Sequence, residues 1–208
     1  AEITCIAAES GVTKVSVPAS IEHEGLAYKV TSLRFSGGTT AEDVEQLLLP
    51  DTLEKLSGWY FSKFVKVKEL CIPGSIKDFS CMLQNAKALE KLTFDEGVEE
   101  ISAGSMVSGC SNLLEINLPS TLKLISGNAT FTNAKSLKSI EFPEGVAFSD
   151  TIVSVLSDCT SLTSVSLPAS LTKVPASMFS GCTSLKSVSA AGAIDSIGDS
   201  AFRDCSSL

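Results

Sequence analysis

A short alternation of apolar and polar residues, usually closed by proline, recurs along most of the chain. The blocks read LLLP, LCIP, LTFD, INLP, IEFP, VSLP and VSAA, and they end at Pro50, Pro73, Asp95, Pro119, Pro143, Pro168 and Ala191. Successive block ends are 23, 22, 24, 24, 25 and 23 residues apart. Such alternation is typical of a short strand with every second side chain pointing inward, and proline ends the strand because it has no N–H to donate to a ladder. The pattern therefore predicts one strand about every 24 residues.

Four further apolar positions keep the same register. Three residues after the proline position come Leu53, Ile76, Val98, Leu122, Val146, Leu171 and Ile194. Three residues later come Leu56, Phe79, Ile101, Ile125, Ser149, Val174 and Ile197, with Ser149 as the exception. A large apolar position is assigned to Phe64, Leu83, Val107, Phe131, Leu156, Phe179 and Phe202. Six residues after it stands a leucine position, assigned to Leu70, Leu89, Leu113, Leu137, Leu162, Leu185 and Leu208.

One repeat of this length is too small to bury its own apolar face. Stacking successive repeats makes a continuous core, in which each strand pairs in parallel with the next and each apolar position becomes a ladder of similar side chains. The sequence thus predicts a leucine-rich repeat solenoid with a parallel β-sheet on the concave side and loops and short helical turns on the convex side. Residues 1–43 are expected to form a capping region of strands and a hairpin, and residues 44–208 the repeat array. The last repeat is incomplete, so the native chain is expected to continue or to be covered there by a partner.

The repeat unit LxxIxLPxxLxxIxxxxFxxCxxL resembles the BspA-like leucine-rich repeats. VSLPASLTKVPASMFSGCTSLKSV, residues 165–188, is the stretch that fits this unit best, and the resemblance covers about residues 44–208. The opening VSVPASIEHEGLAYKVTSL, residues 15–33, is similar to the strand and hairpin with which such arrays begin. The resemblance implies a surface or secreted protein of a host-associated bacterium or a protozoan, with a role in adhesion.

Composition excludes several other classes of protein. The chain has 208 residues, of which 44% are hydrophobic, so it can bury a sizeable core and is not disordered. Its net charge is -8 and it has no basic stripe, so a nucleic acid is not an expected partner. No run of 18 apolar residues suggests a membrane span, and the sequence as given carries no signal peptide, which processing could have removed.

Seven cysteines suggest a disulfide framework at first, but four of them occupy one repeat position. Cys110, Cys159, Cys182 and Cys205 stand three residues before the leucine position, where other repeats have alanine. Buried free thiols are therefore predicted, with a bridge between neighbouring coils as the alternative. There is no CxxC, and the single histidine, His23, is far from these cysteines, so no metal site is predicted. No catalytic motif is present, and neither an enzyme nor a cofactor is expected.

The predicted sheet offers a surface for a partner. Residues on either side of the inward strand position face solvent, and eight strands about 4.8 Å apart give a wall of about 600 Å². A standard interface covers about 800 Å² per partner, so the wall with its rim fits one protein or an extended glycan. The candidate contact residues on it are Leu48, Glu69, Lys91, Thr93, Glu115, Asn117 and Glu141. A plain polar surface that keeps the array soluble is the alternative interpretation.

Trp59 and Tyr60 are the remaining candidates, because these residue types are frequent at binding hot spots. They lie in SGWYFSKFVKVKEL, residues 57–70, which departs from the repeat. The alternative is that they fill an irregular turn. The sequence therefore predicts a non-catalytic protein-recognition module, extracellular or on the cell surface, that binds a protein such as a host extracellular or surface protein. A glycan-binding module and a structural spacer of a larger surface protein are the alternatives.

Overall fold

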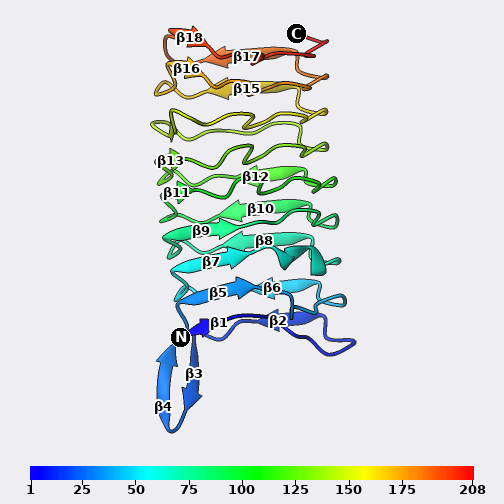
Figure 1. Cartoon of the computed structure of the whole chain (residues 1–208), viewed down its shortest axis with the longest axis vertical. Helices are drawn as coiled ribbons and strands as arrows, with labels where there is room; N and C mark the ends of the chain where they lie inside the picture. The colour runs from blue at the N-terminus through cyan, green and yellow to red at the C-terminus, as the bar shows by residue number, and fades with distance from the viewer.

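The computed structural model describes residues 1–208 as a column of stacked coils (Figure 1). Nearly every coil contributes one strand to a face that we call the first-strand face, which follows the repeated blocks; the coil around Glu141 contributes only a single bridge. The strands of this face are β2 (Lys14–Ser16), β6 (Gln46–Leu48), β8 (Glu69–Ile72), β10 (Lys91–Phe94), β12 (Glu115–Asn117), β15 (Ser164–Leu167) and β17 (Ser187–Ala190). All pairings among them are parallel. The predicted fold class, a leucine-rich repeat solenoid with a parallel sheet, is confirmed.

A second parallel ladder, which the sequence pattern did not predict, forms after each proline turn. Its strands are β1 (Glu2–Ile3), β5 (Ser32–Phe35), β7 (Lys55–Gly58), β9 (Asp78–Cys81), β11 (Glu100–Ile101), β13 (Leu124–Ile125), β14 (Ala147–Phe148), β16 (Lys173–Val174) and β18 (Ser196–Ile197). Side chains such as Leu56 and Phe79 point from this ladder into the core and are buried. Helix is limited to one 3-10 turn, η1 (Tyr60–Lys63), so the expected helical turns are mostly tight turns instead.

Those tight turns form the third side of each coil and stack through peptide hydrogen bonds of their own. The N–H of Val107 donates to the carbonyl of Thr130 (3.4 Å), and the N–H of Phe131 donates to the carbonyl of Val155 (2.9 Å). Residues two positions before or after the large apolar position adopt positive φ, as at Ser105 (49°). Left-handed residues reverse the chain sharply there, which lets the intervening large side chain point inward.

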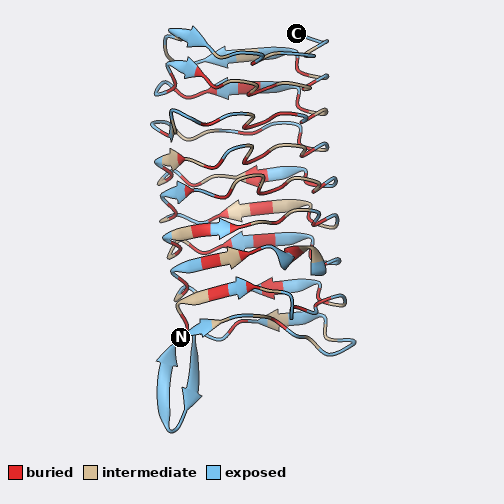
Figure 2. Cartoon of the chain, viewed as in Figure 1, coloured by how far each residue is buried: buried red, intermediate tan, exposed pale blue.

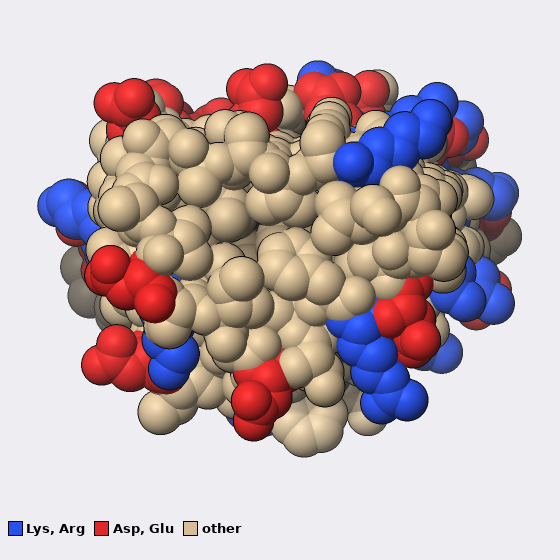
Figure 3. Space-filling view, turned by 90° about the horizontal axis from the view of Figure 1, so that it is seen from above, with Lys and Arg blue, Asp and Glu red and all other residues tan.

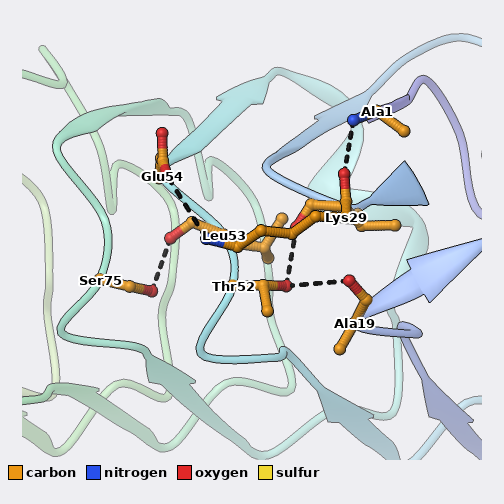
Figure 4. Close-up of polar contacts among 8 residues, drawn as sticks. Ala1, Ala19, Lys29, Thr52, Leu53, Glu54 and Ser75 are labelled. Atoms are coloured by element: carbon orange, nitrogen blue, oxygen red, sulfur yellow. Dashed lines mark hydrogen bonds and ion pairs between the residues drawn. The ribbon is translucent and has the colours of Figure 1, made fainter. Parts of the chain in front are cut away.

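The interior is one apolar core that runs the length of the column (Figure 2). Hydroxyl groups close the turns that follow the prolines. Thr52 donates to the carbonyl of Val30 (2.7 Å) and Ser75 to the carbonyl of Leu53 (2.6 Å), so each hydroxyl bridges to the preceding coil (Figure 4). Ser170 makes the same contact with Val146 (2.6 Å). These bonds satisfy carbonyls that the strand ladders leave free.

Two positions assigned from the sequence are wrong by a few residues. Leu70 pairs with Leu92 and therefore belongs to the inward strand position rather than to the leucine position. In that coil Phe61 and Val67, both fully buried, take the large and the leucine positions. Phe64 then falls at the small position that alanine or cysteine fills elsewhere. Its ring packs against Phe61 and Phe35, with centroids 5.0 and 5.4 Å apart.

The second correction concerns Ser149. Phe148, not Ser149, pairs with Ile125 in the second ladder, so the apolar position is filled after all. The turn before it is one residue shorter than in neighbouring coils. The extra residues of this coil lie after the strand, around Asp150–Ile152.

At the N-terminal end, β3 (Ser20–His23) and β4 (Leu26–Lys29) form an antiparallel hairpin that projects away from the column (Figure 1). β1 and β2 already stack in parallel on β5 and β6. The division into residues 1–43 and 44–208 stays a prediction.

All seven cysteines are free thiols, and three of them are fully buried in one column. Each repeat-position thiol donates to a carbonyl of the preceding coil: Cys110 to Leu83 (3.1 Å), Cys159 to Phe131 (3.3 Å), Cys182 to Leu156 (3.1 Å) and Cys205 to Phe179 (3.1 Å). Burial raises the pKa of Cys110 and of Cys182 to about 12. The predicted buried thiols are confirmed at Cys110, Cys159 and Cys182, which stay protonated at neutral pH, whereas Cys205 is only partly buried.

We expect Phe64→Ala to lower the free energy of unfolding by about 3–5 kcal/mol, because it empties space between two packed rings. The neighbouring Val65→Ala is the control: Val65 is 52% exposed, so its loss should cost less than about 0.5 kcal/mol. Urea titrations of both variants measure the difference. Equal losses would show that the aromatic cluster does not stabilise this coil.

Alkaline pH should destabilise the protein through its buried thiols. Unfolded cysteines ionise near pH 8.5, whereas burial keeps Cys110, Cys159 and Cys182 protonated in the folded chain. The contribution of these thiols to the free energy of unfolding is therefore fully present below about pH 8.5. It is lost as the pH rises, by about 2 kcal/mol per thiol between pH 8.5 and pH 10. A triple variant with alanine at these positions, as at Ala86, should lose much less. Urea titrations at both pH values test this, and identical pH slopes in the two proteins would refute it.

Candidate functional site

The first-strand face carries seven of the nine residues proposed from the sequence. Strand register places Glu69, Lys91 and Glu115 in one row and Cys71, Thr93 and Asn117 in the next. Leu48 lies on β6 of the same face, and Glu141 forms an isolated backbone β-bridge with Ser166 further along it. The strand alternation alone therefore identified which side chains share this surface.

Side chains in the middle of the face are fixed by contacts with each other. Lys91 forms an ion pair with Glu115 (2.9 Å), and the side-chain amide of Asn117 donates to Glu115 (2.6 Å) and to Thr93 (3.4 Å). The hydrogen bond from Lys91 lowers the pKa of Glu115 below its usual value, and Glu115 raises the pKa of Lys91 in turn. These groups stay charged at neutral pH and hold a defined arrangement across β10 and β12.

The ladder of the first-strand face is interrupted twice, between β6 and β8 and between β12 and β15, where only the bridge from Glu141 to Ser166 remains. β6 pairs with β2, and β8 pairs with β10, but β6 and β8 share no ladder. Figure 1 shows a wider step between these two strands than between their neighbours. The interruption between β6 and β8 falls in the coil that contains η1 and Phe64, whose bulky ring stands where other coils place a small side chain.

An open groove of about 990 Å³ lies at this interruption, and we call it the β6–β8 groove. Its apolar part includes Leu48, 47% exposed, and Val65, 52% exposed, above the buried Leu47 and Leu70. Its charged and polar lining comprises Glu45, Gln46, Lys66, Lys68, Glu69, Lys91 and Thr93. Exposed apolar side chains surrounded by polar groups are typical of a site that contacts another molecule.

Ion pairs neutralise the lysines of the groove, and besides Lys91 with Glu115 two more pairs lie beside it. Lys66 contacts Asp43 (2.8 Å) and Lys68 contacts Glu90 (2.9 Å), and in each case the hydrogen bond raises the pKa of the lysine. Viewed along the column from one end, both acidic and basic side chains occur around the outside of the molecule (Figure 3). The groove itself is lined by glutamates and lysines together. The groove is thus an apolar patch with mixed charges, not a basic surface.

Trp59 and Tyr60 lie apart from the groove. They follow β7, which belongs to the second ladder, and they are 72% and 43% exposed. Trp59 directly precedes η1 and Tyr60 is its first residue, while the buried side chains of this turn are Phe61 and Phe64. The sequence reasoning missed Glu45, Val65 and Lys66, although the irregular stretch that contains Val65 and Lys66 was already a signal.

The structure gathers no group of three or more His, Cys, Asp or Glu side chains that could hold a metal ion. His23 is on the exposed hairpin beside Glu24 (3.9 Å). None of the helical structure is long and apolar enough to cross a membrane. The β6–β8 groove and the rows around it can bury apolar side chains of another molecule and pair with its charged or hydrogen-bonding groups.

Comparison with solved structures gives several bacterial leucine-rich repeat proteins. One from Eubacterium ventriosum is 19% identical, with a TM-score of 0.51, and the match covers 99% of this chain and 71% of that chain. The leucine-rich repeat protein of T. pallidum is 21% identical over 68% of this chain and 78% of its own, with a TM-score of 0.49. A leucine-rich cell surface protein of Faecalibacterium prausnitzii is 14% identical over 92% and 90%, with a TM-score of 0.42. At these identities the likeness to the E. ventriosum protein supports the fold alone.

No curated protein matches the chain. The model of the BspA type leucine-rich repeat region matches residues 12–129 and 106–208, with six copies, and so spans nearly the whole column. The repeat positions, the parallel ladders and this match agree, and the chain belongs to the BspA-type leucine-rich repeat family.

Proposed function

We propose that this chain is a non-catalytic recognition module that binds a protein partner through its first-strand face. The observation that carries the proposal is the β6–β8 groove, where Leu48 and Val65 are exposed side by side with charged groups. Apolar anchors within a polar rim are the usual composition of a protein interface. The partner is a host or neighbouring-cell protein, and the role is adhesion or cell contact.

The rows beside the groove support the same function. Lys91, Glu115 and Asn117 are held by mutual contacts, so binding would not have to order them. Preorganised polar groups reduce the entropic cost of association and define which partner fits. The face together with its rim also offers a surface of the size that one partner covers in a standard interface.

A surface or secreted location is part of the proposal. It rests on the family, whose repeats occur mainly on surface and secreted proteins of host-associated bacteria, as the resemblance of the repeat implies. A protein with net charge -8 and no basic stripe also suits an environment where it does not contact nucleic acids.

A glycan is the second candidate partner, and one observation favours it. Trp59, 72% exposed, and Tyr60, 43% exposed, lie together outside the groove, and exposed aromatic rings can stack on sugars. With only two such rings, we rank this function below protein recognition. Trp59→Ala separates the two, because it should abolish glycan binding and leave binding at the β6–β8 groove unchanged.

The test is binding of the purified chain to a panel of extracellular matrix and cell-surface proteins. Leu48→Ser should weaken binding at least tenfold, because it removes the most central apolar anchor. A charge swap, Lys91→Glu with Glu115→Lys, should weaken it by a similar factor, since it reverses the field while keeping the ion pair. Surface plasmon resonance against each panel member measures both effects.

The matched control swaps an ion pair of the second ladder, Lys55→Glu with Asp78→Lys, whose atoms are 2.7 Å apart. This swap makes the same charge change on the opposite sheet and should leave binding unaltered. If both swaps weakened binding equally, or if Leu48→Ser had no effect, the first-strand face would not be the binding surface.

A further inference from the structure

The two strands that border the β6–β8 groove present peptide groups that no other strand of the chain satisfies. Gln46 donates to Thr13, and Leu48 accepts from Val17, so alternate residues of β6 bond to β2. The peptide groups of Leu47 consequently face β8. On β8, Ile72 accepts from Asp95 in the β10 coil, so Glu69 and Cys71 face β6. No backbone hydrogen bond joins the two strands.

These free peptide groups are too close together to receive another strand. Some Cα atoms of β6 and β8 lie within 8 Å of each other. An inserted strand would need two successive spacings, about 9.6 Å in total. A single side chain with several hydrogen-bond donors fits the space better than a backbone does.

The carboxylates of Glu45 and Glu69 line the same groove and have no ion-pair or hydrogen-bond partner in the chain. The cations nearest to them are already bound to other acids: Lys66 to Asp43, Lys68 to Glu90 and Lys91 to Glu115. Two acidic groups therefore remain unpaired beside unpaired carbonyls. An incoming group that carries a positive charge and several N–H donors would complement both.

We infer that the β6–β8 groove receives an arginine side chain from an extended segment of the partner protein, with an adjacent aliphatic or aromatic side chain resting on Leu48 and Val65. This inference rests on the proposed function and names the chemistry of the partner. Arginine suits the groove because its planar guanidinium has five donors in a fixed fork, enough for both carboxylates and a carbonyl. Lysine has three donors on a compact ammonium and would satisfy fewer acceptors.

Selection from a random heptapeptide library displayed on phage tests the inference with a defined probe. Panning on the whole chain should enrich peptides that contain arginine next to an aliphatic or aromatic residue, with arginine preferred over lysine. The enriched peptide and its citrulline counterpart, which keeps the shape but not the charge, are then titrated by fluorescence anisotropy. Loss of a charge-assisted hydrogen bond should weaken the citrulline peptide by about 10- to 100-fold.

The double variant Glu45→Gln with Glu69→Gln should weaken the arginine peptide by a similar factor and leave the citrulline peptide nearly unaffected. The matched control, Glu22→Gln with Glu24→Gln on the projecting hairpin, removes the same charge far from the groove and should bind as the unaltered chain does. Circular dichroism establishes that all variants are folded.

Three results would overturn the inference. They are a selection without arginine, an arginine peptide that binds the Glu45→Gln and Glu69→Gln variant with unchanged affinity, and a selection that enriches no peptide. In the first two cases, sensitivity of the selected peptides to Leu48→Ser would preserve protein recognition at the first-strand face and remove only the arginine. In all three cases, the effect of Leu48→Ser on binding to the panel of extracellular matrix and cell-surface proteins tests the proposed function independently.

Discussion

Every coil of this protein depends on the coil beside it, because about 24 residues cannot bury an apolar face or pair their own peptide groups. Neighbour stacking solves both problems together: apolar positions align into continuous columns while strands and turns hydrogen-bond from coil to coil. The thiol and hydroxyl contacts follow the same rule, since Cys110 and Ser75 each reach back to a carbonyl of the preceding coil. A residue's role is therefore set mainly by its position within the repeat.

This dependence also determines where the protein can recognise something. In a regular ladder the peptide groups are saturated, and only alternate side chains are offered to a partner. The second coil breaks the regularity, because Phe64 occupies a position that suits alanine or cysteine and packs on Phe35 and Phe61. The β6–β8 groove lies in the same coil as this irregular packing. The aromatic cluster in the core and the missing ladder between β6 and β8 therefore occur together.

The sequence was sufficient for the fold and for the rows of the first-strand face, because a period of about 24 and a strand alternation of two fix both. It was insufficient in the second coil. Phe61, Phe64, Val67 and Leu70 are all apolar and follow at intervals of three, so two frames fit the repeat equally well. Only the pairing of Leu70 with Leu92 decides between them. In a later coil a turn shorter by one residue had a similar effect: the constant spacing assigned the apolar position to Ser149, whereas Phe148 occupies it.

The candidate groove could not be predicted for a related reason. A missing ladder between β6 and β8 leaves no mark in either strand, since both keep the alternation of a paired strand. What distinguishes Glu45 and Glu69 from Glu90 and Glu115 is likewise a matter of neighbours. Glu90 and Glu115 have lysines one coil away, at 2.9 Å, whereas the two groove carboxylates have none within contact. Charges that pair between coils stabilise the array, and charges left unpaired at an irregular coil are free to select a partner.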